Sequence, residues 1–180
     1  PAHHDSDRGH AVKRAALLFV VVLSACGPEQ STEPGFNLEL AVQRGLLDVI
    51  GGFQVALVTN ISSVEGGDCT VIRTKCIKDQ VPASRFVPLK NPATNMTQAA
   101  LVFPINLTNG TPNTQDLSLT EVPPGRDYGL IIEAIAKDGV RLAGAECQFV
   151  QQLNAGSNPR VLMRIQQYNP PKMCDPRLVP

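Results

Sequence analysis

The stretch from residue 119 to residue 150 constrains the fold more than any other part of the sequence. It begins with a turn at 122–125 (VPPG), in which proline fixes one φ and glycine permits a positive φ. Apolar residues then occupy alternate positions before a second turn at 137–139 (KDG); they are Tyr128, Leu130, Ile132 and Ala134. Because successive side chains of a strand point to opposite faces, this pattern predicts two long antiparallel strands joined by a hairpin.

The return strand of this hairpin is less well specified. Leu142, Ala145, Cys147 and Phe149 are expected to lie on it. Gly144 can mark a β-bulge, so the pattern leaves the register of the strand open.

The same two-residue period recurs elsewhere in the chain. Residues 53–58 are apolar on both faces, which is typical of a central strand. Residues 69–76 fit either a strand or a short helix. We therefore predict an all-β fold, a single antiparallel β-sandwich of about seven strands, with a short helix near 69–77 as the alternative to a strand there. The other expected strands lie near 38–42, 101–107, 117–119 and 161–165.

An apolar segment near the start of the sequence follows two cations, Lys13 and Arg14, and ends in Leu23-Ser24-Ala25-Cys26. The apolar run is about half the ~20 residues that a membrane-spanning helix needs, so it fits a signal-peptide core. This segment resembles the type II signal peptide and lipobox of bacterial lipoproteins. The resemblance implies cleavage after Ala25 and acylation of Cys26 by diacylglycerol and palmitate-type chains, which would bind the protein to membrane lipid.

The signal divides the chain into four expected regions. Residues 1–25 would be removed, and residues 26–35 would form the lipidated cysteine and a flexible polar tether. Residues 36–168 would form the sandwich, and 169–180 a proline-rich tail tethered by a disulfide. The resemblance also predicts location in the bacterial cell envelope, at the outer membrane because Gly27, and not Asp, follows the lipidated cysteine.

Four further cysteines follow Cys26, and an even number in an exported chain predicts two disulfides. They are Cys69, Cys76, Cys147 and Cys174. Of the three possible pairings we favour Cys69 with Cys76 and Cys147 with Cys174, although the first pair requires the segment between them to be bent rather than one complete helix. A zinc site is disfavoured because the chain lacks CxxC spacing.

The order of turns at 119–150 resembles that of prealbumin-like, carboxypeptidase-regulatory-like and bacterial Ig-like sandwiches. This resemblance covers only the C-terminal part of the chain and implies fold rather than activity. It also implies that Tyr128 is a tyrosine-corner residue whose hydroxyl bonds to nearby backbone. Phe86 and Tyr168 are the aromatic residues expected to be exposed.

Catalysis finds little support in the residues. All three histidines, His3, His4 and His10, precede the lipobox, which excludes a Ser-His-Asp triad in the cleaved chain. Carboxylates are expected to lie on turns and exposed strand faces, without convergence; they are Asp116, Glu121, Asp127, Glu133, Asp138 and Glu146. We therefore predict no enzyme activity, no cofactor and no metal site.

The main functional hypothesis is a membrane-anchored envelope lipoprotein whose non-catalytic sandwich acts as a binding, adhesion or assembly module for an envelope protein or polymer. With 16 basic and 16 acidic residues and no basic stripe, nucleic acid is not an expected partner. The alternative is an enzyme or enzyme accessory with a carboxylate-only or calcium-assisted site, using Glu65 with Asp68 or Asp127 with Asp138. A carbohydrate-binding module is less favoured, because few aromatic residues are free to stack on a sugar.

Overall fold

The computed structural model describes residues 34–63, 69–105 and 117–178, and these residues form ten strands and a few short helical turns. The helical elements are α1 (Arg44–Leu47), η1 (Ile61–Ser63), α2 (Cys69–Ile72), η2 (Ile77–Asp79) and η3 (Ala83–Arg85). The strands are β1 (Phe36–Ala41), β2 (Ile50–Val58), β3 (Leu89–Lys90), β4 (Thr97–Gln98), β5 (Ala100–Pro104), β6 (Leu117–Leu119), β7 (Gly125–Ala136), β8 (Leu142–Leu153), β9 (Arg160–Arg164) and β10 (Gln166–Lys172).

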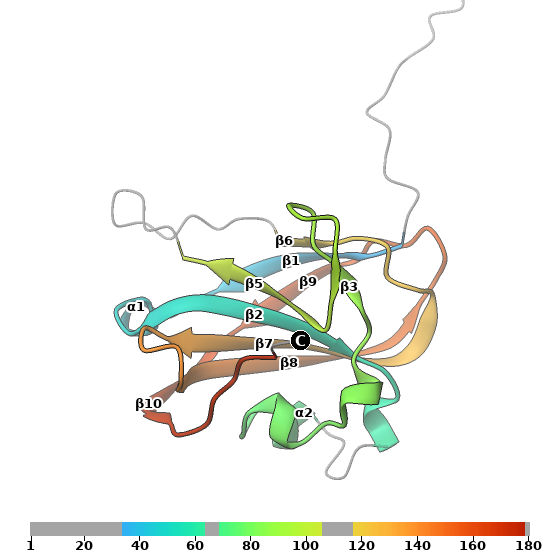
Figure 1. Cartoon of the computed structure of the whole chain (residues 1–180). Coiled ribbons are helices and arrows are strands. Elements are labelled where there is room, and N and C mark those ends of the chain that lie inside the picture. The colour runs from blue at the N-terminus through green and yellow to red at the C-terminus, as the bar shows by residue number, and fades with distance from the viewer. Residues whose placement is uncertain (1–33, 64–68, 106–116, 179–180) are drawn as a thin grey trace, which may run out of the picture. The chain divides into compact units, whose positions relative to one another are not determined.

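Two sheets lie against each other as the layers of a sandwich (Figure 1). One sheet has the strand order β6-β1-β9 and the other β10-β8-β7-β2-β5, while β3 and β4 form a separate small ribbon. The predicted all-β sandwich is thus confirmed, and so is the central position of β2, which lies between β7 and β5. The pairing of β1 with β9 is parallel, an exception in an otherwise antiparallel arrangement.

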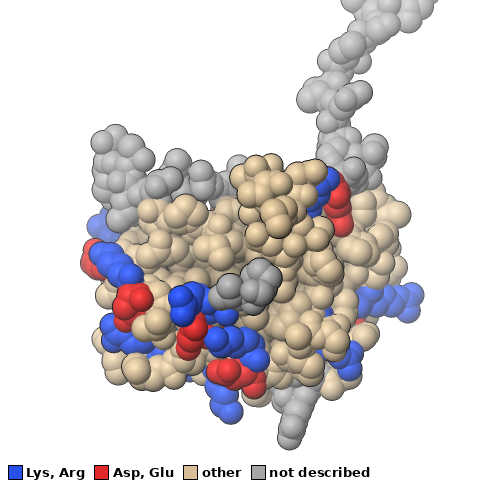
Figure 2. Space-filling model, in the orientation of Figure 1, with Lys and Arg blue, Asp and Glu red and all other residues tan. Residues whose placement is uncertain are grey.

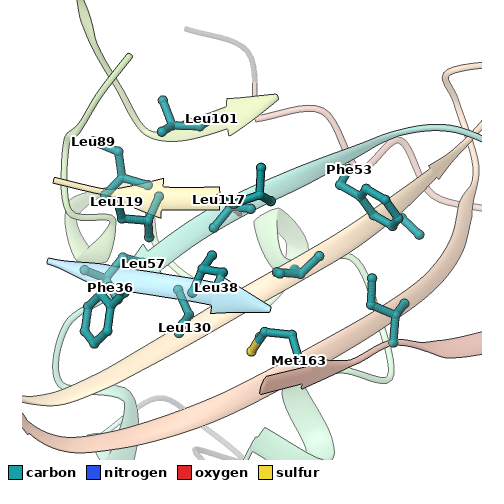
Figure 3. Close-up of a cluster of buried hydrophobic side chains, with 14 of the residues drawn as sticks. Phe36, Leu38, Phe53, Leu57, Leu89, Leu101, Leu117, Leu119, Leu130 and Met163 are labelled. Carbon is teal, nitrogen blue, oxygen red and sulfur yellow. The ribbon is translucent and has the colours of Figure 1, made fainter. Parts of the chain in front are cut away.

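The core between the sheets is built from the inward residues of both layers (Figure 3). Phe36 and Leu38 of β1 meet Leu57 of β2 and Leu130 of β7, and all four are almost completely buried. Burial of each such side chain contributes about 1.5–3 kcal/mol to folding. The alternation along β1 and β7 therefore specifies the sandwich through its apolar face.

The hairpin of β7 and β8 forms where the sequence predicts it. Gly139 at the turn has φ of 74°, a conformation that glycine adopts without strain. Ala134 pairs with Gly144 and Ile135 with Leu142, so Ala143 is the extra residue of a bulge. A Cβ atom on Gly144 would lie only 2.5 Å from a backbone oxygen of β10, which explains why glycine stands there.

Tyr128 is buried, and its hydroxyl donates a 2.7 Å hydrogen bond to the carbonyl oxygen of Pro123. This is the backbone bond that the sequence predicts for a tyrosine-corner residue. We expect Tyr128→Phe to lower the free energy of unfolding by about 1–2 kcal/mol, since the hydrogen bond from the buried tyrosine to the Pro123 carbonyl is lost. Urea denaturation followed by circular dichroism would measure the change.

Tyr168→Phe is a matched control for that substitution. The Tyr168 hydroxyl is buried but has no hydrogen-bond partner among the described residues, so its removal should leave stability unchanged or slightly increase it. Equal losses in the two variants would contradict a specific role for the bond from Tyr128 to Pro123.

A second apolar cluster covers the outer face of the larger sheet. Ile72, Ile77 and Val81 pack there against Val58 and Ile131. The short helix α2 confirms helical structure near 69–77. Residues 69–81, here called the covering segment, thus close a second core on the side of the sheet away from β1.

Both disulfides fasten this covering segment, and they differ from the pairing favoured on sequence. Cys69 bonds to Cys147 with the Cα atoms 5.1 Å apart, and Cys76 bonds to Cys174 with a separation of 6.1 Å. The prediction of Cys69 with Cys76 is wrong because α2 begins at Cys69 and the chain continues past it before reaching Cys76, so that Cys69 meets Cys147 of β8 and Cys76 meets Cys174 after the end of β10. Cys147 lies on the outer face of β8 beneath α2, which brings it to Cys69 and not to Cys174.

The C-terminal residues are not a separate tail. β10 runs from Gln166 to Lys172 along β8, so it crosses the boundary expected at residue 168. The stretch that follows returns over the outer face of the sheet and ends in front of β7 (Figure 1). Cys174 holds this stretch to the covering segment through its disulfide with Cys76.

Candidate functional site

The candidate site arises where one continuous stretch passes from one sheet to the other. β9 pairs with β1 in the smaller sheet, and β10, which begins two residues after β9 ends, pairs with β8 in the larger sheet. β10 meets β8 at residues 142–145 only. In the part of the chain that the structure describes, no strand pairs with the remaining length of β8 on that side.

A groove follows the seam between the two sheets at this place. One part, of about 500 Å³, is bounded by residues 148–152 of β8 and residues 159–162 at the start of β9. A second part, of about 560 Å³, shares Gln148 and continues toward the end of β1; we call the two together the seam groove. Its second part is lined by Ala41, Val42, Gln43, Arg73, Glu146, Gln148, Arg164, Ile165 and Gln166.

Apolar and basic side chains mark the rim of the seam groove. Phe149 is 52% exposed and Leu162 is 39% exposed. Phe149 pairs with Gly129 and lies on the outer face of the sheet, the same face as Cys147. Arg160 and Arg164 are also exposed, and they alternate with the inward residues of β9.

The free side of β8 presents backbone hydrogen-bonding groups. The N–H of Cys147 does not bond within the ladder but donates to the carboxylate Oε1 of its neighbour Glu146 at 3.0 Å. Residues two apart in a strand direct their N–H and C=O groups to the same side. The backbone N–H and C=O groups of Phe149 and Gln151 therefore point toward the seam groove. Among the described residues, these groups form no backbone hydrogen bond outside the strand pairing.

Glu146 closes one end of this open edge. Its side chain is only 5% exposed, and Arg73 of the covering segment lies 3.8 Å from the same oxygen. The carboxylate thus accepts the hydrogen bond of the Cys147 N–H, the first backbone donor of the free edge. Sequence reasoning placed Glu146 on an exposed face, and that prediction is wrong.

A second polar cluster is buried under the covering segment. Glu133, 1% exposed, accepts a 2.8 Å bond from the N–H of Ile77 and a 3.0 Å bond from Nε2 of Gln54. Gln54 Nε2 also donates to the carbonyl of Pro176 at 2.8 Å, and Gln54 Oε1 accepts from the N–H of Leu178 at 2.9 Å. The network joins β2, β7, η2 and the C-terminal stretch, so it holds the cover in place.

Burial raises the pKa of Glu133 to about 7, although the two donated hydrogen bonds and Lys78 oppose the shift. Burial likewise raises the pKa of Tyr168 to about 12, and the charge of Glu133 adds to that effect. Shifted carboxyl groups often mark functional sites. A groove of about 440 Å³ is lined by Gln54, but Glu133 itself is not part of that lining.

The acids named from the sequence do not converge. Glu133 is paired with Ala145 and Glu146 with Ile132, which places the two carboxylates on opposite faces of the sheet. The expectation that both would be solvated is wrong, because the covering segment buries Glu133 and the seam buries Glu146. Asp116 lies outside the described residues, and Glu121 forms an ion pair with Lys90.

The residues named for calcium do not form one site. Asp127, near the start of β7, accepts hydrogen bonds from Ser62, whereas Asp138 accepts them from Arg141 in the turn beyond the other end of β7. Glu65 and Asp68 lie outside the described residues. Among the described residues, one group of potential metal ligands comes together, Cys76, Asp79 and Cys174, and both of its sulfurs are in a disulfide.

On the face shown in Figure 2, Lys and Arg side chains lie beside Asp and Glu side chains, mainly over its lower left part. None of the helices in the described ranges is long and apolar enough to cross a bilayer. No family model, curated protein or solved structure matches the chain. The seam groove and the sequence motifs are thus the grounds for inferring a function.

Sequence reasoning did not find the seam groove. The predicted strand near 161–165 is continuous with the residues that follow, and nothing in the alternation shows where it changes sheets. One signal was present: Gln148, Gln151 and Gln152 break the apolar pattern in the second half of β8, as an edge facing water would. Cys26, the predicted lipidation residue, lies outside the described residues.

Proposed function

We propose that the protein is a lipid-anchored lipoprotein of the bacterial cell envelope, at the outer membrane, whose non-catalytic sandwich binds another protein or an envelope polymer through the seam groove. The observation that carries the proposal is the second half of β8, which has no strand partner among the described residues on the side away from β7. It lies next to the exposed side chains of Phe149 and Leu162. Exposed apolar residues beside open backbone groups are typical of an interaction surface.

The path of the chain into the domain supports a role at a membrane surface. The N–H of Gly35 donates to the carbonyl of Ser157 at 3.0 Å, and that of Asn37 donates to the carbonyl of Pro159. The chain therefore enters the sandwich beside the turn that connects β8 to β9, at one end of the seam groove. An anchor at Cys26 would hold this end toward the membrane.

The anchor predicts a clear change for Cys26→Ser. We expect the variant to incorporate no labelled palmitate and to move from the membrane fraction to the soluble fraction, because the acylated thiol is lost. Ser31→Ala, in the same tether, is the matched control and should stay with membranes. A Cys26→Ser protein that remains membrane-bound would contradict the lipid anchor.

Binding through the seam groove can be tested in intact envelopes of the producing cells. A photo-crosslinking residue in place of Leu162 should form defined adducts, whereas the same residue in place of Val140, 45% exposed in the turn after β7, should not. Identification of the adduct as protein or polysaccharide would name the class of partner. Equal labelling from the two positions would contradict a specific role for the groove.

An enzyme or enzyme accessory remains the second candidate function, with Glu133 as its strongest feature. The raised pKa of that carboxyl gives it the protonation range of a general acid. Its two donors are structural groups of the fold, however, and the other acids lie on different faces or turns. The binding role therefore has more support in the geometry.

A further inference from the structure

We propose that the seam groove binds an extended peptide segment of a partner protein as an added β-strand, paired with β8 at residues 148–152. This inference rests on the proposed function and specifies its partner. Strand addition uses backbone hydrogen bonds for affinity and alternate side chains for specificity. Each of these requirements can be matched to residues of the groove.

The backbone requirement is met by the free side of β8. The bond from Cys147 N–H to Glu146 fixes which residues face outward, and Phe149 and Gln151 are the next two. β10 already pairs with β8 at residues 142–145 on this same side. A strand from the partner (the guest strand) would therefore continue the backbone pairing that β10 makes with β8, beyond the point where the Glu146 carboxylate interrupts it.

The space available limits the guest to a short segment. Glu146 caps the edge on one side, and β8 ends at Leu153 before the turn to β9. A strand rises about 3.3 Å per residue, so roughly five guest residues fit between these limits. This length suits a linear segment or a chain terminus of the partner.

The side-chain requirement is met by apolar residues along the seam. Val150 of β8 and Val161 of β9 are partly buried and pack against the main core. Because side chains of the guest alternate between faces, every second one would enter the seam between these two valines. Those positions should carry branched apolar residues.

Charge at the rim selects the flanks of the guest. Arg164 lines the groove and has no ion-pair partner among the described residues. Arg160, 75% exposed at its side chain, has Glu39 as its ion-pair partner among the described residues, with the two charged groups 3.9 Å apart. Guest segments with acidic residues beside the apolar core are therefore favoured.

The probe is an acetylated, amidated peptide of sequence Glu-Thr-Val-Thr-Val-Thr-Glu, titrated against the full-length protein in detergent micelles. We expect Gln151→Pro to weaken binding at least tenfold, because proline removes the outward N–H without touching the ladder to β7. Gln151→Ala keeps that N–H and should bind within about twofold of the unchanged protein. Circular dichroism and intact disulfides would show that both variants are folded.

Two kinds of peptide variant test the strand pairing and the charge preference independently of Gln151→Pro. Two N-methylated peptides are compared, one methylated at the odd-numbered and one at the even-numbered amides. Only the peptide whose methyl groups lie on the edge facing β8 should lose binding, because its N–H donors to β8 are removed. Exchange of both peptide acids for Lys should weaken binding, and Arg164→Glu should reverse that preference. These results do not depend on whether Gln151→Pro folds.

The outcomes separate this inference from the proposed function. Equal binding of the peptide to the Gln151→Pro and Gln151→Ala variants, or no binding at millimolar peptide, overturns strand addition. If crosslinking from position 162 then yields a polysaccharide adduct, the proposed function stands with a different partner. If neither the peptide nor the crosslinker reports a contact at the seam, both proposals fail.

Discussion

Replacing Cys76 and Cys174 together by serine should lower the free energy of unfolding by about 2–5 kcal/mol. The bond joins residues 98 apart in sequence, so its loss frees a long loop in the unfolded chain. It also releases the C-terminal stretch that supplies the partners of Gln54, namely the carbonyl of Pro176 and the N–H of Leu178. Denaturation in guanidinium chloride, with and without reductant, would measure the loss.

The controls for this experiment separate the two disulfides. Reductant should destabilise the double serine variant further, because Cys69 and Cys147 still form their own bond across 78 residues. Trypsin cleaves after Arg73 and Lys75, both of which lie between Cys69 and Cys76. Mass spectrometry of the unreduced digest should therefore find Cys69 and Cys76 in different disulfide-linked fragments. A fragment joining residues 69 and 76 would contradict the pairing.

Stability should fall as the pH rises from about 4.5 to above 7, because of Glu133. Its pKa is about 7 in the folded protein and near the ordinary value of 4.5 when unfolded. Between these values the folded state binds the proton more tightly, so stability is fully present below pH 4.5 and is lost as the pH passes 7. The difference corresponds to about 3 kcal/mol as an upper bound.

Glu133→Gln should remove this part of the pH dependence, since the amide does not titrate. Its unfolding free energy should be nearly constant over the same range, as measured by urea denaturation at several pH values. Glu39→Gln, which changes an exposed carboxylate on β1, should keep the slope of the unchanged protein. A stability that stays flat or rises from pH 4.5 to 7 in the unchanged protein would show that the two donors, Ile77 and Gln54, outweigh burial.

The sequence predicts the fold well where short-range patterns determine it. The hairpin of β7 and β8 follows from turn residues and a two-residue period, and both act over neighbouring positions. The disulfide pairing does not follow in this way, since it depends on which strand α2 covers. The path of residues 69–81 over the sheet depends on tertiary contacts that no local sequence pattern encodes.

Glu133 shows why the alternation misleads at one point. A two-residue period implies that one face of the sheet is exposed to water, and the Glu133 carboxylate lies on the face that this alternation predicts to be exposed. Yet β2 is apolar on both faces, which already indicates that the sheet is covered on both sides. That observation extends to the neighbouring strand, where it predicts burial of Glu133 opposite Gln54.

The seam groove depends on a change of sheet that leaves no mark in the sequence. Residues 160–172 read as one strand followed by a proline-rich tail, because Pro170 and Pro171 disfavour a central position. At the edge of the sheet those prolines are tolerated. Among the described residues, the transfer of pairing from β1 to β8 at Ile165 leaves the second half of β8 without a strand on the side away from β7.

The entry of the chain beside Ser157 has a consequence for how weak the binding at the groove can be. Nine residues, 27–35, separate Cys26 from β1, and even fully extended they reach only about 30 Å. If Cys26 carries the proposed lipid anchor, the groove would be held that close to a bilayer and would meet other anchored proteins at an effective concentration that can reach the millimolar range. A strand of five residues with modest intrinsic affinity would then be occupied at the membrane surface and empty in dilute solution.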